Sequence, residues 1–176
     1  MIKLIYGPMR SGKSATLIDA IEDAQSKNKS IRCYKPKMDT RSEYIKSRNG
    51  KKIECLSVSS FASIYDDAIK IKGLEIIFID EVQFLKPDGL KILIKFALSN
   101  NIDVIASGLN LTSEFEIFET TSRYAMYCEE IEHIKGKCEV CGSEDSMFSR
   151  CNSEKNGAVL IGDEIYSQTC FKCFNS

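Results

Sequence analysis

The chain has no long apolar run, no excess of charge of either sign and a single histidine. Its 176 residues include no uninterrupted apolar stretch near the roughly 20 residues that a membrane span needs. Gly7 also follows the start too soon for the apolar core of a signal peptide. With 24 Lys and Arg against 25 Asp and Glu, the net charge of −1 gives no field that favours nucleic acid or a membrane surface. These absences predict a cytoplasmic protein that binds neither.

The eight cysteines then favour a metal site over disulfides, because the cytosol keeps thiols reduced. Two C-x-x-C pairs, Cys138 with Cys141 and Cys170 with Cys173, are separated by 28 residues. Four thiolates close a tetrahedral site against water, so the pairs predict a structural zinc, with a redox pair as the alternative. The remaining cysteines, Cys33, Cys55, Cys128 and Cys151, are interpreted as ordinary buried or free thiols. The single histidine, His133, is interpreted as a surface or interface residue.

The segment from Gly7 to Ser14 matches the phosphate-binding pattern G-x-x-x-x-G-K-[ST], with an apolar run before it and a helical pattern after it. A glycine-rich turn at a helix N-terminus offers converging backbone N–H groups to a triphosphate. Lys13 is expected to reach the β- and γ-phosphates, and the Ser14 hydroxyl to bind Mg²⁺. A strand–turn–helix without nucleotide is the alternative. The predicted nucleotide-binding residues are Gly7, Pro8, Met9, Arg10, Ser11, Gly12, Lys13 and Ser14.

Apolar runs alternate with helical patterns up to about Glu132, which is typical of a parallel sheet covered by helices. We expect a P-loop NTPase-like α/β domain over residues 1–133 and a small zinc-ribbon-like domain over residues 134–176. In the second domain, Ala158–Ile161 is the only obvious strand. The first is predicted to hold strands at Ile2–Tyr6, Ile31–Tyr34, Ile53–Leu56, Glu75–Ile79 and Val104–Ser107, helices at Lys13–Asn28, Ser59–Lys72 and Pro87–Ser99, and long loops at Lys35–Lys52 and Asn110–Thr121.

Two carboxylates follow the apolar run that ends at Ile79. Asp80, at the carboxyl end of a central strand, is expected to hold Mg²⁺ together with Ser14. Glu81 would alternate to the other side of the strand, face the acceptor and take its proton. Loop capping is the alternative for both carboxylates. In the charged loop, Arg41 could neutralise charge on a transferred phosphoryl group, or belong to a solvated loop.

These motifs follow one another in a set order: the phosphate loop, Asp39-Thr40-Arg41, Asp80-Glu81-Val82-Gln83-Phe84, Gly108-Leu109 and the paired C-x-x-C motifs. With this ordered set the chain resembles the thymidine kinases of the zinc-containing cellular and bacterial type over nearly its whole length. The resemblance implies transfer of the ATP γ-phosphoryl to the 5′-hydroxyl of thymidine, with Mg²⁺, by a homotetramer that thymidine triphosphate inhibits. Deoxyuridine is a further expected acceptor, because a missing methyl in an apolar pocket costs only about 1–3 kcal/mol.

The resemblance also assigns roles to residues. Glu81 falls on the general base, while Lys13, Ser14 and Asp80 fall on the phosphate and magnesium positions, and Arg41 on an arginine near the reacting phosphates. A lasso-shaped loop, about Gly108 to Phe118 here, encloses the thymine together with the zinc unit. The implied substrate-binding residues are Met9, Asp39, Phe84, Leu109, Phe118, Leu160, Ile161, Gly162 and Tyr166, with core packing as the alternative for the apolar ones.

This lasso loop departs from the family pattern, whereas the phosphoryl-transfer residues match it. Asn110 replaces an Asp, one pocket aromatic is missing at Ser113, and Glu114 and Phe115 occupy the Arg-Gly positions; Phe115 could substitute if the loop shifts. Elsewhere Arg48 replaces a His, Phe148 stands where a threonine often lies, and the segment before Tyr166 is one residue short. Two other functions therefore stay open: a nucleotide-binding protein with altered or lost thymidine turnover, and a nucleic-acid-dependent zinc-ribbon ATPase, against which the near-neutral charge counts.

Overall fold

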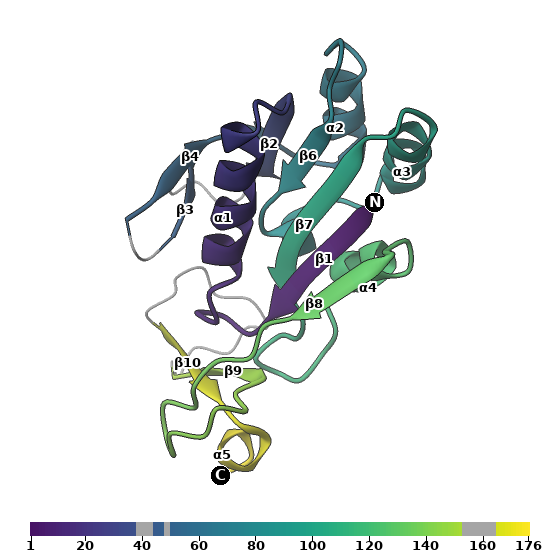
Figure 1. Cartoon of the computed structure of the whole chain (residues 1–176). Helices are drawn as coiled ribbons and strands as arrows, with labels where there is room; N and C mark the ends of the chain where they lie inside the picture. Colours follow the sequence, from purple (N-terminus) through teal and green to yellow (C-terminus); the bar gives the residue numbers. More distant parts are fainter. Residues whose placement is uncertain (38–43, 48–49, 153–164) are drawn as a thin grey trace.

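Figure 1 shows the computed structural model of the chain, which describes residues 1–37, 44–47, 50–152 and 165–176. Within these ranges, no helix has the length and apolar character needed to cross a membrane. Several predicted features lie outside the described residues: Asp39, Arg41, Arg48, the patch Ala158–Ile161, and the candidate substrate residues Leu160, Ile161 and Gly162.

Among the described residues, six parallel strands form the main sheet in the order β5-β2-β6-β7-β1-β8. Parallel pairing brings the carboxyl ends of all these strands to one edge of the sheet, where Figure 1 shows the arrowheads of β1 and β7. The candidate functional residues lie at this edge. The strands are β1 (Ile2–Gly7), β2 (Ile31–Pro36), β5 (Leu56–Val58), β6 (Ile76–Ile79), β7 (Asp103–Leu109) and β8 (Glu130–His133).

Helices cover both faces of this sheet (Figure 1). Helix α1 (Lys13–Ser26) buries Leu17, Ile18 and Ile21 against one face, because residues three and four apart share a side of a helix. The other face packs against α2 (Phe61–Ala68), α3 (Leu90–Ser99) and α4 (Glu119–Ala125). Covering on both faces explains why β6, which reads Ile-Ile-Phe-Ile, is apolar throughout. The predicted α/β class is confirmed.

The predicted strand Ile53–Leu56 is wrong, because the chain divides there between two sheets. β4 (Lys52–Glu54) pairs antiparallel with β3 (Tyr44–Lys46), whereas β5 joins the main sheet beside β2. Ile45 and Ile53 lie opposite each other in the hairpin and pack against the cluster under α1. Burial of this isoleucine pair accounts for the separate hairpin, which also places a strand in the predicted loop Lys35–Lys52.

The sequence prediction also missed α4 and β8, and it placed helix ends too far out. β8 lies at the edge of the sheet and reads Glu-Ile-Glu-His. Charged residues are usual on an edge strand, and they leave too few apolar residues for a strand to be recognised from the sequence. α4 begins inside the predicted loop Asn110–Thr121. Helix α2 begins at Phe61 because the Ser60 hydroxyl caps it, accepting the Ser63 N–H at 3.3 Å.

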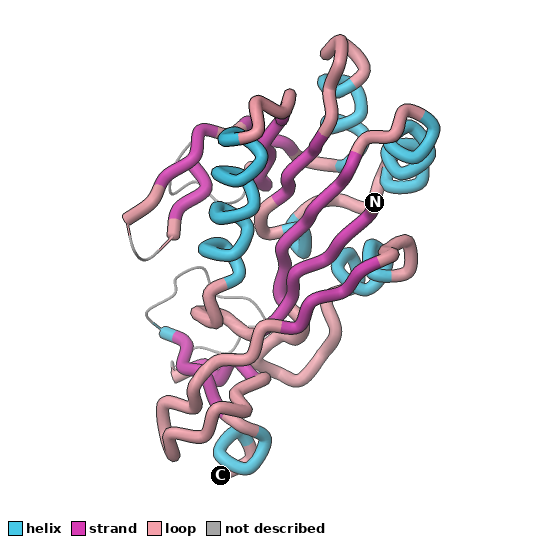
Figure 2. The backbone as a smooth tube through the Cα atoms, viewed as in Figure 1, coloured by secondary structure: helices cyan, strands magenta, loops and turns pink. Residues whose placement is uncertain are grey.

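A C-terminal unit (residues 134–176) follows β8 and lies beside the carboxyl ends of β1 and β7 (Figure 1). Its described part holds an antiparallel pair, β9 (Phe148–Cys151) with β10 (Tyr166–Thr169), and the short helix α5 (Phe171–Phe174). Figure 2 shows that the rest of its described backbone is mostly loop. Neither β9 nor β10 was predicted, since short polar strands lack a clear apolar alternation. The domain division at residues 133 and 134 stays a prediction.

Candidate active site

The phosphate loop connects β1 to α1 as the motif predicts. Gly12 takes φ 100° and Arg10 φ 66°. Gly12 has no side chain, so it adopts this conformation without steric cost. Gly7 is required for a different reason, since a Cβ there would lie 2.2 Å from the carbonyl oxygen of Ile134. The loop therefore leads directly into the N-terminus of α1, where N–H groups have no helical partner and suit phosphate oxygens.

Lys13, Ser14 and Asp80 come together at this helix start. The Ser14 hydroxyl donates to Asp80 at 3.2 Å, Ser107 also donates to this carboxylate, and Lys13 Nζ donates to the Pro8 carbonyl at 2.6 Å. Asp80 is only 6% exposed. Burial raises the pKa of its carboxyl, and the Ser107 hydroxyl and the Lys13 ammonium oppose this rise. A buried carboxylate beside a serine hydroxyl offers the hard oxygen ligands that Mg²⁺ prefers.

Glu81 does not continue the strand, because β6 ends at Ile79. Its backbone takes φ 53° and ψ 45°, a left-handed conformation, and the predicted strand alternation therefore does not apply to it. Its carboxylate accepts a hydrogen bond from Gln83 Nε2. Gln83 Oε1 in turn accepts the backbone N–H of Leu109 at 3.1 Å. The candidate base is thus connected to Leu109, where β7 ends and the lasso loop (residues 108–118) begins.

The described candidates for the acceptor pocket fall into two groups. Phe84 and Phe118 form an edge-to-face pair with ring centroids 6.2 Å apart. Leu109 belongs to the same group because its N–H donates to Gln83, the residue before Phe84. Tyr166 is buried, and its carbonyl accepts a hydrogen bond from Arg10 at 3.2 Å, next to the half-buried Met9. The first group lies at the carboxyl edge of the main sheet, and the second joins the phosphate loop to the C-terminal unit.

The lasso loop is anchored on the C-terminal unit. Asn110 Nδ2 donates to the Met147 carbonyl at 2.9 Å. Phe115, at φ 68° and 51% exposed, stacks on Phe148 with ring centroids 5.6 Å apart and also approaches the rings of two further phenylalanines, Phe171 and Phe174. Two of the residues that depart from the family pattern, Phe115 and Phe148, therefore contact each other. Ser113 is half-buried and supplies no ring.

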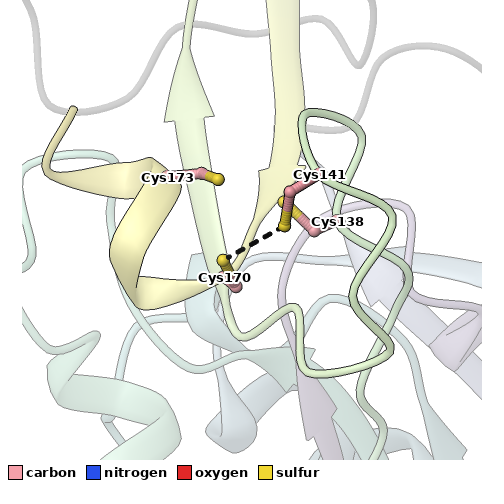
Figure 3. A group of neighbouring side chains, drawn as sticks. All are labelled: Cys138, Cys141, Cys170 and Cys173. Atoms are coloured by element: carbon pink, nitrogen blue, oxygen red, sulfur yellow. Dashed lines mark hydrogen bonds between the residues drawn. The ribbon is translucent and has the colours of Figure 1, made fainter.

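Figure 3 shows the four cysteines of the two C-x-x-C pairs gathered in one group. Cys138 and Cys141 come from the loop between β8 and β9, and Cys170 and Cys173 from the start of α5 and from α5 itself. Their sulfur atoms all lie within 4.8 Å of one another, and those of Cys141 and Cys170 are 3.7 Å apart. Zinc–sulfur bonds of about 2.3 Å in a tetrahedron put the sulfurs about 3.8 Å apart, so the group fits zinc. Backbone N–H groups, Cys141 foremost, lower the pKa of the Cys138 thiol to about 6. The other four cysteines, Cys33, Cys55, Cys128 and Cys151, lie outside this group and form no disulfide.

The C-terminal unit also holds the phosphate loop, a connection that the sequence did not predict. The Ser149 hydroxyl accepts the backbone N–H of Met9 at 2.8 Å. Arg10 Nη1 lies 3.1 Å from a carboxylate oxygen of Glu139, which stands between the first two cysteines. One small unit therefore contacts both the phosphate loop and the lasso loop.

Comparison with known proteins agrees with this arrangement. A family model described as thymidine kinase matches residues 1–174. The chain belongs to the thymidine kinase family. A thymidine kinase of Pseudothermotoga lettingae is 30% identical and covers 99% of this chain and 94% of its own length. Thymidine kinases of Listeria monocytogenes serovar 1/2a and of Enterobacteria phage T4 are each 29% identical, over 96% and 97% of this chain and 93% of their own lengths.

Membership of the thymidine kinase family makes the chain a kinase, that is, a phosphotransferase that uses a nucleotide. Among solved structures, a RuvB mutant of Thermogota maritima gives a TM-score of 0.45 and 10% identity over 78% of this chain and 39% of that chain, which is too weak to carry an argument.

Sequence reasoning missed three polar residues of this kinase site, Gln83, Ser107 and Ser149. Each of them lies beside a residue that the sequence does single out: Gln83 precedes Phe84, Ser107 precedes Gly108, and Ser149 follows Phe148. Position in the chain alone gave none of the three a role. His133, predicted to be a surface or interface residue, is half-buried and stacks on Tyr6 with ring centroids 4.5 Å apart.

Proposed function

We propose that this protein transfers the γ-phosphoryl group of ATP to the 5′-hydroxyl of thymidine or deoxyuridine. The Glu81 carboxylate accepts the proton of the 5′-hydroxyl, the bond from O5′ to the γ-phosphorus forms, and the bond from that phosphorus to ADP breaks. Lys13 binds the β- and γ-phosphates. Ser14 and Asp80 hold Mg²⁺, which when bound neutralises charge on these phosphates. Arg41, outside the described residues, is assigned to the charge on the moving phosphoryl group.

The observation that carries this proposal is the contact of Ser14 with Asp80 at the start of α1, with Glu81 next in the chain. Asp80 is buried beside the Lys13 ammonium and two serine hydroxyls, and a carboxylate is buried at low cost only among such partners, which argues against simple loop capping. Glu81 is partly exposed at the same edge of the sheet, where an acceptor can reach it. Donor-side and acceptor-side groups are thus supplied by adjacent residues.

The zinc group is proposed to be structural. Four cysteines would fill the tetrahedral coordination of zinc and leave no position for substrate or water, so no step of the reaction depends on it. Its proposed contribution is to hold the C-terminal unit in one conformation against the phosphate loop and the lasso loop.

The test of the function is a side-by-side turnover measurement with ATP and Mg²⁺ over thymidine, deoxyuridine, deoxycytidine and deoxyguanosine. We expect monophosphate from thymidine and deoxyuridine, with kcat/KM for deoxyuridine lower by about 10- to 200-fold at most, the range for a missing methylene-sized group. Absence of any thymidine monophosphate would reject the proposed activity. A preference for a purine nucleoside would reject the proposed acceptor class while leaving a kinase.

One observation favours a second candidate, a protein that binds thymidine nucleotides without turnover. The lasso loop lacks the aromatic at Ser113, and Phe115 is committed to the stack on Phe148 of the C-terminal unit. An altered loop could hold the nucleoside away from Glu81. Calorimetry that shows thymidine binding, together with no monophosphate in the turnover assay, would select this candidate.

Assembly as a homotetramer and inhibition by thymidine triphosphate are proposed on the family resemblance alone. Sedimentation equilibrium tests the first, and a titration of thymidine triphosphate into the turnover assay tests the second. A monomer, or turnover that is unaffected by the triphosphate, would reject the corresponding part.

A further inference from the structure

The side chain of Gln83 joins two parts of the site that lie far apart in the sequence. It follows β6 in the single turn Val82–Phe84 and is only 7% exposed. Its Nε2 donates to the Glu81 carboxylate, and its Oε1 accepts the Leu109 N–H at 3.1 Å. The amide therefore spans from the candidate base to the lasso loop.

Both ends of this amide have a defined chemical role, so its orientation is fixed. A backbone N–H only donates, so the atom that faces Leu109 has to be the oxygen. The nitrogen then faces Glu81, and an ionised carboxylate only accepts. A flipped amide would place donor against donor and acceptor against acceptor. Gln83 is thus specific in its chemistry as well as in its shape.

The packing around Gln83 leaves it little freedom. A Cβ at Gly108 would lie 2.6 Å from Val82 Cγ1 and 3.2 Å from Gln83 Oε1, so glycine lets the end of β7 approach this turn. Val82 is fully buried in the core. Glu81 itself is held in a left-handed conformation. Its backbone and Gln83 therefore both constrain the direction of the Glu81 carboxylate.

We propose that Gln83 is a positioning residue of the reaction, which aims the Glu81 carboxylate at the acceptor hydroxyl and ties it to the lasso loop. This inference rests on the proposed function, in which Glu81 is the base. Gln83 acts through Glu81 and not on the substrate. Because displacement of a catalytic group by about 1 Å can cost about 100-fold in rate, loss of this support lowers kcat more than it weakens binding.

Gln83→Glu separates this role from a purely structural one. The new side chain keeps an oxygen for the Leu109 N–H but turns a carboxylate, in place of a donor, toward Glu81. We expect kcat to fall about 10- to 100-fold while KM for thymidine changes less than about threefold. The matched control is Gln25→Glu on the exposed side of α1, which adds the same charge and retains wild-type kcat. Wild-type kcat in Gln83→Glu would overturn the proposal.

A thermal double-mutant cycle tests the same contact without any turnover. Its four proteins are the wild type, Glu81→Gln, Gln83→Glu and the double variant. Gln83→Glu places two carboxylates together and lowers the melting temperature, whereas in the double variant the new amide at position 81 donates to the new carboxylate and restores much of the loss. Additive changes in melting temperature would overturn the proposed pairing.

The two measurements distinguish this inference from the proposed function. A wild type that makes no thymidine monophosphate rejects the function, and the thermal cycle still decides whether Gln83 holds Glu81. If Gln83→Glu is unfolded at the assay temperature, Gln83→Met carries the kinetic test. It has similar length and no hydrogen-bonding amide, so wild-type kcat in that variant would also overturn the role.

Discussion

At the residue scale, Glu81 combines a strained backbone with its proposed role as the general base. A left-handed conformation costs a residue other than glycine about 1–2 kcal/mol, and such strain persists only where the surroundings enforce it. Here the buried Val82 and the two hydrogen bonds of Gln83 enforce it. The left-handed backbone turns Glu81 away from the direction of β6. The adjacent carboxylates of Asp80 and Glu81 therefore contact different partners.

The role of Glu81 as base predicts a selective effect of Glu81→Gln. The amide keeps the shape of the side chain but accepts no proton, so kcat should fall by about 100-fold or more, the usual contribution of a general base. Thymidine affinity should change less than about threefold. Steady-state kinetics and calorimetry on the same preparation measure both quantities. Full turnover by this variant would exclude Glu81 as the base.

The predicted site residues that the structure brings together are local to a motif or to a strand end. Ser14 and Asp80 meet because the carboxyl ends of parallel strands share one edge with the start of α1. Gln83, Ser107 and Ser149 were missed because their partners lie 26, 27 and 140 residues away. Such contacts depend on strand register and on docking of the C-terminal unit, which local patterns do not encode.

At the scale of elements, the long apolar strands and helices were predictable and the short polar elements were not. β6 reads as an apolar run because helices cover both its faces. β9 and β10 are four-residue strands that pair with each other in a small unit, and their buried positions do not alternate with exposed ones. The split of Ile53–Leu56 required knowledge of which sheet each half joins.

Helix α2 is joined to β2 by Asp67, which accepts hydrogen bonds from Arg32 at 3.0 Å and from Tyr34 at 2.9 Å. Burial pushes the pKa of the Asp67 carboxyl upward, but these two bonds, together with the positive charges of Arg32 and Lys70, leave the pKa below its ordinary value. A lowered folded pKa stabilises the fold above the unfolded pKa and loses that contribution as pH falls through the folded value. Since the pair is partly exposed, the contribution is about 1 kcal/mol or less.

We therefore expect Asp67→Asn to be less stable than the wild type at pH 7, with the difference shrinking as pH falls toward 3. Urea unfolding of both proteins over this pH range measures it. A difference that stays constant with pH would show that packing, and not the charge of Asp67, is responsible.

The contact between the phosphate loop and β9 predicts a role for Ser149 in nucleotide binding. Ser149→Ala leaves the Met9 N–H without its partner, and a hydrogen bond of this kind contributes about 1 kcal/mol. ATP affinity should fall about three- to tenfold. Ser167→Ala, which removes a hydroxyl on β10 that bonds Asn152, is the matched control. Calorimetry with a non-hydrolysable ATP analogue gives both affinities, and equal values for the two variants would contradict the link.

At the scale of the whole molecule, the C-terminal unit is a brace between the phosphate loop and the lasso loop. It holds the phosphate loop through Ser149 and Glu139, and it holds the lasso loop through Met147 and Phe148. Neither main core cluster includes a residue of the four-cysteine group. The sheet and its helices should therefore keep their fold when the unit is loosened.

Removal of zinc should accordingly weaken binding of ATP and of thymidine together, by about tenfold or more each, while the helical signal in circular dichroism is retained. Cys170→Ser opens the four-cysteine group, and we expect it to lose the one zinc ion per chain that metal analysis should find in the wild type. Cys151→Ser is the control, because Cys151 lies on β9 in the same unit but outside that group, and it should keep zinc and both affinities. If zinc-free Cys170→Ser bound thymidine normally and lost only ATP affinity, the brace would act on the phosphate loop alone, and the anchoring of the lasso loop through Phe115 would carry no binding energy.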